Sequence, residues 1–359
     1  MVGVYKMSIE NLEELRKTTI KKCNKNNLVF LLIFLVIVGV FFLIFKTISV
    51  HFIFIAFIVY IPFGIMNEKV KSEYKNTFMR SLLPIAVKNL LTDVQVDVNS
   101  GIPSYVVDST HSMSTGDRYN SSNFVSGKYK DIKVMMSDVH IQDEHEDSEG
   151  HTSYVTIFLG QWMIFDFNKY FKSNVQVWEK KVFGGISRRW KSGLKKVELE
   201  DISFNKKFKV LSENELEAFY IITPKLMERI TAVEAAINGT LMMVFNNNQL
   251  HVAVYNNKTT FNINIHKRIN FEEFARESIK DLDAIIKFVD ILELDNDLFK
   301  AGDVNKMGEP VVGDVAEAAI TSSNQGIVAA NTKTLDSSVQ KNSSIENVDA
   351  VTYFNNLNK

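Results

Sequence analysis

Two apolar runs, separated by only a few residues, constrain this 359-residue chain more than any other feature. The first extends from Leu28 to Phe45 and the second from Ile48 to Met66, and neither contains Lys, Arg, Asp or Glu. Each is close to the length of about 20 residues that a helix needs to cross a bilayer core. Lipid offers the backbone no hydrogen-bond partner, so both runs are predicted to be helices. We therefore expect residues 28–66 to form a transmembrane helical hairpin.

Basic residues flank this predicted hairpin and indicate its orientation. Cytosolic segments next to membrane spans carry an excess of Lys and Arg. Only Lys46 lies in the turn, whereas the two outer flanks contain Arg16, Lys17, Lys21, Lys22, Lys25, Lys69, Lys71, Lys75 and Arg80. We expect a protein that crosses the inner (cytoplasmic) membrane twice, with both termini cytosolic. A cleaved signal peptide is disfavoured, because a second apolar run follows the first at once without a small-residue cleavage site.

The bulk composition narrows the classes of partner. The formal net charge of −1 provides no overall field for nucleic acid, so we expect none to bind. The single cysteine, Cys23, cannot form an internal disulfide or a cysteine-rich zinc site. We expect the lipid bilayer to be one partner, with anionic headgroups attracted to the basic flanks. No cofactor is predicted.

The rest of the chain divides by composition and periodicity. Residues 1–27 form a basic N-terminal segment, and residues 67–85 carry an apolar stripe at helical spacing that predicts a stalk helix ending near Pro84. The stripe needs a partner, which the domain, the first helix or a second copy of the chain could supply. Residues 301–359 have few aromatic residues, and this predicts a disordered tail.

Residues 86–300 are predicted to form a cytosolic α+β domain with a mainly antiparallel sheet. Two longer helices are predicted, one opened by Ser212 with Glu215 and one by Asn270 with Glu273. A β-bulge is predicted near Ser137–Asp138, where the alternation of apolar residues shifts by one position. Alternation and β-branched or aromatic residues predict strands over residues 132–141, 154–167, 175–179, 197–202, 241–245, 250–255 and 261–265.

The stretch HIQDEHEDSEGH, residues 140–151, has the composition of a metal site. Its histidines, His140, His145 and His151, are spaced by five and six, which matches neither one face of a helix nor one face of a strand. We therefore predict a solvated hairpin loop. Zinc or nickel binding, a weak calcium site and a pH-sensitive contact are the alternatives.

A second stretch, GGISRRWKSGLKK at residues 184–196, combines basic charge with an aromatic residue. Tryptophan and cations suit the surface of an anionic bilayer, so we interpret this loop as a lipid- or partner-binding site. An ordinary solvated loop and a nucleic-acid contact are the alternatives. The residues of this basic loop are Arg188, Arg189, Trp190, Lys191, Lys195 and Lys196.

No catalytic motif of a known class occurs in the sequence. There is no Gly-x-Ser-x-Gly elbow, His-Glu-x-x-His helix, phosphate-binding Gly-Lys-Ser/Thr loop or dinucleotide fingerprint. Two apolar runs without intramembrane charge also offer a transporter no ion path. We therefore expect a membrane-anchored scaffold or interaction protein. A membrane-tethered hydrolytic enzyme is the alternative, because catalytic triads assemble from distant residues.

Two segments carry a resemblance to a known family. FLGQWMIFDFNK at residues 158–169, followed by VELEDISFNKKFKVLSENELEAFYIITPKLMERI at residues 197–230, resembles the bacterial membrane-protein family catalogued as domain of unknown function 3137. The resemblance covers roughly residues 65–295 and implies a fold and a membrane location, but no catalytic residue. It also implies a LemA-like membrane protein as a partner. Phe219-Tyr220 departs from the Arg-Tyr pair that is more frequent in the family.

Overall fold

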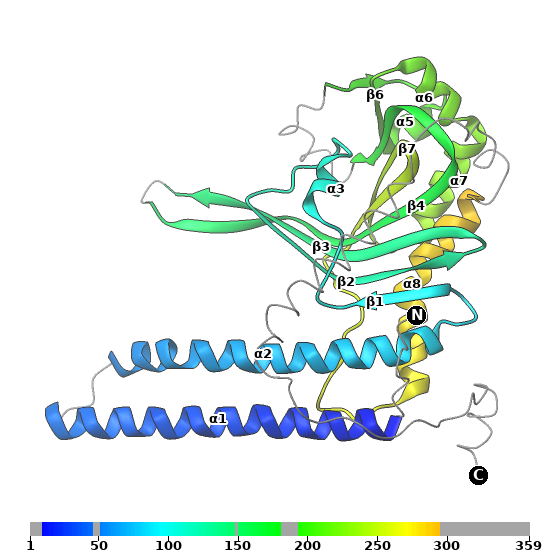
Figure 1. The fold of residues 1–359 in the computed structure, drawn as a ribbon. Helices are drawn as coiled ribbons and strands as arrows, with labels where there is room; N and C mark the ends of the chain where they lie inside the picture. The colour runs from blue at the N-terminus through cyan, green and yellow to red at the C-terminus, as the bar shows by residue number, and fades with distance from the viewer. Residues whose placement is uncertain (1–8, 46–50, 148–149, 181–192, 295–359) are drawn as a thin grey trace, which may run out of the picture.

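The computed structural model describes residues 9–45, 51–147, 150–180 and 193–294 (Figure 1). The predicted tail, residues 301–359, lies outside these ranges. The elements in chain order are α1 (Ile9–Phe45), α2 (His51–Ala86), β1 (Thr92–Asp97), α3 (Ser104–Asp108), β2 (Arg118–Tyr129), β3 (Ile132–Glu146), β4 (Thr152–Glu179), β5 (Lys195–Val197), α5 (Ile202–Lys207), β6 (Phe208–Ser212), α6 (Glu215–Ile221), α7 (Pro224–Ala236), β7 (Thr240–Tyr255) and α8 (Phe271–Leu292).

The prediction of an α+β fold with an antiparallel sheet is confirmed. The strands are hydrogen-bonded in the order β1-β2-β3-β4-β6-β5, and β7 also pairs with β4. Every pairing among these strands is antiparallel. β1 therefore forms one edge of the sheet and β5 forms the other. Figure 1 shows α2 running along the β1 edge.

The sheet buries both of its faces. One face packs on α2, α7 and α8, and this larger core contains Phe78, Phe165 and Phe288. Phe78 of α2 contacts Phe274 of α8 edge-to-face, with 4.9 Å between ring centroids. The opposite face packs on α3 and contains Trp162. Two buried faces explain why the central strands are apolar along most of their length.

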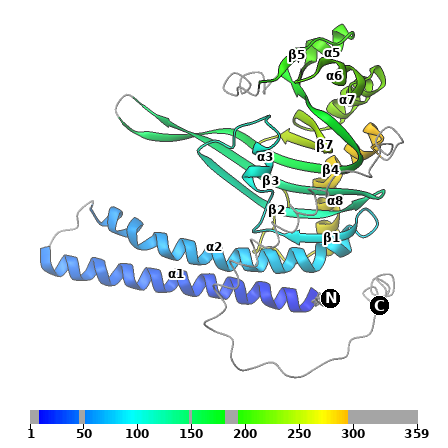
Figure 2. The same cartoon turned by 45° about the horizontal axis from the view of Figure 1, so that its top comes forward.

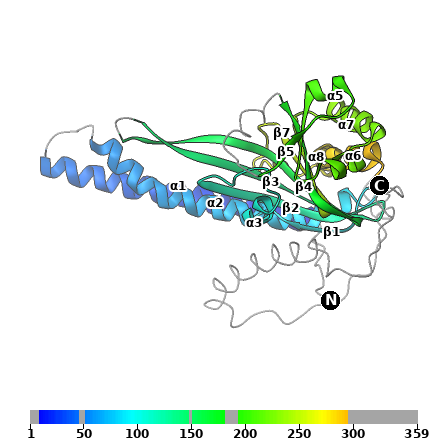
Figure 3. The ribbon, with the colours of Figure 1, turned by 90° about the horizontal axis from the view of Figure 1, so that it is seen from above.

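α1 and α2 lie antiparallel and side by side (Figures 2 and 3). The Asn67 side chain of α2 accepts a hydrogen bond from Asn26 Nδ2 (2.9 Å) and donates one to Asn27 Oδ1 (2.7 Å). Farther along, Phe30 contacts Phe63 with 5.9 Å between ring centroids. Asparagine amides therefore join the helices next to Leu28 and Met66, where the apolar runs meet the polar flanks.

The outer half of α1, from Leu28 onward, is apolar and exposed. Leu28, Leu35 and Leu43 are 56%, 54% and 77% exposed. Among the helices described with their side chains, α1 alone is long and apolar enough to cross a membrane. The side chains of residues 51–60 in α2 lie outside the described part of the chain. The structure thus supports a membrane anchor, whereas the two-span hairpin stays a prediction.

The inner half of α1, which precedes Leu28, packs against the domain. Leu12 is fully buried, and the Arg16 guanidinium donates to the Ile265 carbonyl oxygen at 2.8 Å. Cys23 is also buried. Residues 9–27 of the predicted N-terminal segment and the first apolar run are therefore one continuous helix. Likewise, α2 joins the second apolar run to the stalk and continues past Pro84 to Ala86, because proline removes only one hydrogen bond near the end of a helix.

The strands predicted over residues 241–245 and 250–255 are not separate strands joined by a turn. β7 is a single strand that pairs with β4 from Tyr255, opposite Gly160, to Met242, opposite Trp178. Within the Asn-rich stretch, Asn247 is the residue with a positive φ, of 52°, and its pairing with β4 is irregular. A two-residue type I′ turn needs two left-handed residues, and this stretch has one. The irregular pairing instead places the extra residues in β4, between Asp166 and Val175. Likewise, β4 is one strand that unites the predicted strands 154–167 and 175–179.

Three further predictions are wrong in detail. The strand predicted over 197–202 ends at Val197, because the Asp201 carboxylate caps α5 through the Ser203 and Phe204 amides. The helix predicted after Ser212 is two helices, capped by Asn214 and Thr223. Residues 261–265 form no strand. The Asn270 cap of α8 is confirmed, with its Oδ1 accepting from the Glu273 amide at 3.1 Å.

The predicted bulge lies where the sequence placed it, but the extra residue belongs to the neighbouring strand. The β2–β3 pairing shifts between Ser122, opposite Asp138, and Val125, opposite Met136. Two residues of β2 thus face Ser137 alone. One of them, Asn123, has a φ of 56° and lies in the left-handed region. Asparagine adopts this conformation more readily than most residues do.

A buried histidine generates a pH-dependence that can be measured. Burial lowers the pKa of His251 to about 3 from its ordinary value of 6.5. The unfolded chain therefore takes up a proton near pH 6.5 that the folded chain does not. As the pH falls from 6.5 toward 3, we expect this histidine to reduce the free energy of unfolding by about 1.4 kcal/mol per pH unit.

His251→Asn should flatten this dependence, because asparagine keeps a hydrogen-bond acceptor for Trp162 Nε1, which lies 3.4 Å from His251 Nδ1, but does not titrate. Chemical denaturation of both proteins from pH 7 to pH 4 measures the difference in slope, so other titrating groups cancel. Equal slopes for wild type and variant would contradict the assignment.

Candidate functional site

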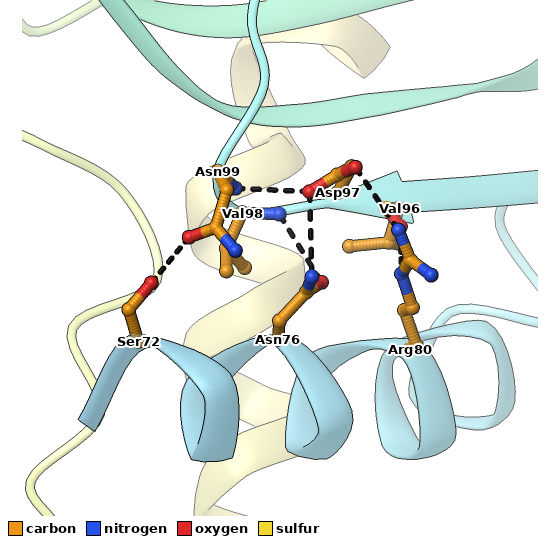
Figure 4. Close-up of polar contacts among 7 residues, drawn as sticks. All are labelled: Ser72, Asn76, Arg80, Val96, Asp97, Val98 and Asn99. Atoms are coloured by element: carbon orange, nitrogen blue, oxygen red, sulfur yellow. Dashed lines mark hydrogen bonds and ion pairs between the residues drawn. The ribbon is translucent and has the colours of Figure 1, made fainter. Parts of the chain in front are cut away.

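Polar side chains at every fourth position of α2 face the edge strand β1 (Figure 4). Arg80 Nε donates to the Val96 carbonyl oxygen at 3.1 Å, and Arg80 Nη2 pairs with Asp97 at 3.0 Å. One turn earlier, Asn76 Oδ1 accepts from the Val98 amide at 3.5 Å, and Asn76 Nδ2 donates to Asp97. Side chains of α2 thus supply partners to a strand edge that would otherwise expose its backbone groups.

Ser72 forms the end of this contact that is nearer to the apolar half of α2. Its hydroxyl donates to the Asn99 side-chain oxygen, and the Asn99 amide donates to Asp97 Oδ1 at 3.0 Å. Asp97 is buried, and its carboxylate accepts hydrogen bonds from Asn76 and Arg80 of α2 and from the Asn99 amide. We call the set Ser72, Asn76, Arg80 and residues 96–99 the α2–β1 junction. It fixes the axial position of α2 relative to the sheet.

Lys75, next to Asn76, extends this junction into the domain. Its Nζ donates to Asn123 Oδ1 at 2.9 Å, and Asn123 Nδ2 donates to Asp138 Oδ2 at 2.6 Å and to the Thr260 carbonyl oxygen at 3.0 Å. The left-handed backbone of Asn123 at the bulge places this amide between helix and sheet. A chain of hydrogen bonds therefore joins α2, β2, β3 and the loop after β7.

Asp138 is the centre of this network. The carboxylate is buried, and both of its oxygens accept hydrogen bonds. Besides Asn123, the donors are the Thr260 amide at 2.8 Å, the Thr260 hydroxyl at 3.1 Å and Gln161 Nε2 at 3.5 Å. Burial raises the pKa of Asp138, and these hydrogen bonds lower it and offset part of that rise. Protein donors, rather than solvent, therefore hydrogen-bond the Asp138 side chain.

Two more ionisable groups complete the network. Asp281 of α8 accepts from the Phe261 amide at 2.7 Å, and the φ of Phe261 is 52°, in the left-handed region. Burial raises the pKa of Asp281 and lowers the pKa of Lys75, while the charges of Asp138 and Asp281 raise the pKa of Lys75. The positive charge of Lys75 therefore offsets the negative charges of Asp138, in the sheet, and Asp281, in α8.

This arrangement is better suited to holding α2 against the sheet than to transferring protons. The Asn123 amide separates the Lys75 ammonium from Asp138, and an amide side chain does not shuttle protons at neutral pH. The two Asp138 oxygens are already engaged by donors from three segments. A general base must instead be within reach of the proton that it abstracts from a substrate. We call Lys75, Asn123, Asp138, Thr260 and Asp281 the buried network.

The predicted histidine stretch is the end of the β3–β4 hairpin. His140 lies in β3 with its Nε2 2.9 Å from Thr156 Oγ1, and His145 lies in the same strand opposite Ser153. His151 Nδ1 is 3.2 Å from Asp147 in the turn. Over the described residues, no group of three His, Cys, Asp or Glu side chains is placed to hold a metal ion. The strands extend to Glu146 and Thr152, so the loop is shorter than predicted.

The predicted basic loop is described only at its end. Arg188, Arg189, Trp190 and Lys191 lie outside the described residues. Lys195 and Lys196 begin β5, at the edge of the sheet opposite to β1, and Lys196 forms an ion pair with Glu198. The structure therefore does not bring the two lysines near the buried network.

Sequence reasoning missed the buried network. It counted Lys75 as one more flanking cation, and it gave Asn123, Thr260 and Asp281 no role. One signal was available, because the phase shift near Ser137–Asp138 marked a bulge, and bulges often place a side chain at a special site. The partners could not be identified, since they come from four separate segments of the chain.

Comparison with known proteins confirms the family resemblance. Residues 156–294 match the family model described as "Protein of unknown function (DUF3137)". The match covers β4 to α8 and omits α1, α2 and the first three strands. It is narrower than the resemblance noted in the sequence, and the family description names no activity. No curated protein is similar to the chain at a significant level.

One solved structure is similar over part of the chain. It is the crystal structure of the mycobacterial trehalose monomycolate transport factor A, TtfA, with 12% identity and a TM-score of 0.31. The alignment covers 58% of this chain and 93% of that one. A likeness at this level is too low to establish a shared fold.

The buried network predicts a large effect of a nearly isosteric substitution. Asp138→Asn would place an amide where one carboxylate oxygen now accepts hydrogen bonds, so at least one donor loses its partner. We expect the free energy of unfolding to fall by about 3 kcal/mol, the upper range for an unsatisfied buried donor or acceptor. Urea denaturation of the detergent-solubilised chain measures this change.

Asp131→Asn is the matched control. Asp131 is exposed and has a φ of 65°, which asparagine also adopts, so we expect a change within about 0.5 kcal/mol. If the two variants were equally stable, Asp138 would not be the centre of the network.

Proposed function

We propose that this chain, whose residues 156–294 match the DUF3137 family model, is a membrane-anchored scaffold or interaction protein. In this proposal α1 and α2 cross the inner membrane as a hairpin, with both termini in the cytosol. The domain is held at the inner face, where it binds a protein or anionic-lipid partner. The observation that carries the proposal is that α2 continues unbroken from its apolar half into the α2–β1 junction.

The unbroken helix supports a fixed attachment rather than a flexible tether. α2 is 36 residues long, and its inner half contributes Tyr74, Phe78 and Leu82 to the larger core. The α2–β1 junction and Lys75 add polar contacts on neighbouring positions of the same helix. Because packing and hydrogen bonding act together, the domain keeps one orientation relative to the anchor.

The chemistry of the boundary supports the hairpin and its orientation. The exposed leucines of α1 form an apolar surface that lipid would cover. Asn26, Asn27 and Asn67 satisfy one another where this surface ends, and exposed Lys25 and Lys69 lie close to them in sequence. Positive charges on the domain side agree with a cytosolic domain.

Two kinds of partner fit this scaffold. The basic loop, with Arg188 and Trp190, suits anionic headgroups. The family resemblance implies a LemA-like membrane protein as a partner, which would meet the domain at the membrane surface. A second copy of the chain is a third candidate. Each would be held at short range by the anchor, and this confinement raises its effective concentration.

The alternative proposal is a membrane-tethered hydrolytic enzyme, and the buried network is the feature that favours it. Lys75, Asp138 and Asp281 have pKa values shifted by burial, as catalytic groups often do. The saturation of Asp138 by donors weighs against this role. We therefore prefer the scaffold.

The topology gives a direct test. Reporter fusions at the N-terminus and the C-terminus should both be active in the cytosol, and a reporter inserted at residues 46–50 should be active outside it. Extraction with alkaline carbonate should leave the chain in the membrane fraction. Release by carbonate, or a terminus outside the cytosol, would contradict the proposed anchor.

Lipid binding by the basic loop can be followed by fluorescence. Trp162 and Trp178 are buried, so a lipid-dependent change of emission should come from Trp190. In nanodiscs containing anionic lipid, we expect a blue shift relative to zwitterionic lipid, because the indole leaves water. Arg188→Glu with Arg189→Glu should abolish the shift, and Trp190→Phe identifies its source. Identical spectra in both lipids would exclude the lipid role of the loop.

A further inference from the structure

One side of α6 is apolar and exposed. Leu216 and Phe219 are 80% and 41% exposed, and Tyr220 is also an exposed residue. The spacing of three and four residues places these three side chains next to one another on the helix. The opposite side carries Ala218 and Ile221, which are buried in the larger core. α6 therefore presents one apolar side to the domain and a second one to the outside. We call Leu216, Phe219 and Tyr220 the α6 face.

The position and size of the α6 face favour a short peptide segment as its occupant. Figures 1 and 3 show α6 at the end of the domain that points away from the apolar halves of α1 and α2, so a bilayer around those halves does not reach it. The three side chains offer roughly 300–400 Å² of surface. A stable interface between two folded proteins takes about 800 Å² from each partner. The α6 face is too small for such an interface.

The chain leaves the described residues close to the α6 face. Glu293 directly precedes Leu294, the last described residue, and forms ion pairs with Lys225 and Arg229 of α7. Figure 1 shows this end of α8 beside α7. Lys225 follows Phe219 by only six residues, so at most about 20 Å of chain separates the two. The residues after Leu294 therefore start from a point near α6.

The aromatic residues of this following chain indicate which segment fits. Aromatic side chains supply the largest apolar contact areas. After Leu294 they are Phe299, Tyr353 and Phe354. Phe299 lies in the acidic sequence DNDLFK, residues 295–300, whereas residues 351–357, VTYFNNL, contain no acid and four large apolar side chains.

Charge discriminates between these two segments. Glu213 and Glu215 are exposed and directly precede or adjoin Leu216 of the α6 face. They repel a segment that carries its own carboxylates. Residues 351–357 bring aromatic side chains without such repulsion, so this segment matches the face in both polarity and charge.

The intervening chain has a suitable length to deliver this segment. Leu294 and Val351 are separated by 56 residues. For a flexible chain of that length, as its composition predicts, the root-mean-square end-to-end distance is about 40 Å. This distance is sufficient to reach α6 from the end of α8. Tethering of this kind keeps a segment at an effective concentration on the order of 1 mM.

We propose that residues 351–357 bind the α6 face of the same chain through the rings of Tyr353 and Phe354. Because the tether supplies the high local concentration, a small apolar contact is enough to keep the face occupied. An external partner that uses the α6 face must then displace this segment.

Disulfide trapping in the full chain tests the contact. In a Cys23→Ala background, Glu215→Cys is combined with Asn355→Cys, and a protease site is inserted after Gly302. After oxidation and cleavage in detergent-free cell extracts, the C-terminal fragment should stay joined to the domain of its own chain until a reductant is added. The measurement does not require membrane attachment, so its outcome is independent of the proposed anchor.

Two control pairs separate docking from chance encounter along the tether. In the first, Asn324→Cys replaces Asn355→Cys. Its tether is about half as long, so loop closure alone would make this crosslink form about threefold faster. In the second, Glu228→Cys replaces Glu215→Cys, because Glu228 is exposed on α7 next to Arg229, which contacts the end of α8. Docking predicts that the Glu215→Cys and Asn355→Cys pair reacts faster than either control. An equal or slower rate would overturn the proposal.

Tyr353→Ser with Phe354→Ser identifies the side chains that make the contact. This double substitution leaves every residue of both cores unchanged, so loss of folding does not confound the result. We expect the crosslinking rate to fall to that of the tether alone, about one third of the rate of the Asn324→Cys control. An unchanged rate would contradict docking through the two rings. A crosslink found only between two chains would contradict docking within one chain.

Discussion

The position of α2 against the sheet is the constraint on which the structure depends. Asn76 and Arg80 satisfy the edge of β1, and Lys75 reaches Asp138 through the amide of Asn123. Charged and polar groups removed from water must be paired, so only one axial position of the helix leaves them all satisfied. Apolar packing alone would tolerate small shifts. The polar contacts therefore give the anchor and the domain one relative arrangement.

The sequence predicted most elements but not how they combine. Apolar runs and the Asn270 cap are local signals, and the α+β class with its antiparallel sheet followed from them. The continuity of β4 and β7 was missed, because each strand supports the other across a bulge and neither shows this alone. Asn214 and Thr223 divide a helix that its apolar spacing predicted to be single, since capping competes with periodicity.

The candidate site was harder to predict, for a physical reason. Asp138 is recognisable only through Asn123, Thr260 and Gln161, which are distant in sequence and polar without any spacing pattern. The stretches with strong composition, around His145 and Lys195, lie at the surface of the domain. Composition detects charge density, whereas a buried network depends on a few complementary atoms.

The length of β4 has a mechanical consequence. This 28-residue strand begins at Thr152 in the β3–β4 hairpin and ends at Glu179. Its pairing with β7 is irregular between Asp166 and Val175, and its pairing with β3 shifts between Thr156 and Phe158. A force applied at the end of the β3–β4 hairpin would be transmitted along one continuous backbone, and the ladder would yield first at these two irregular stretches.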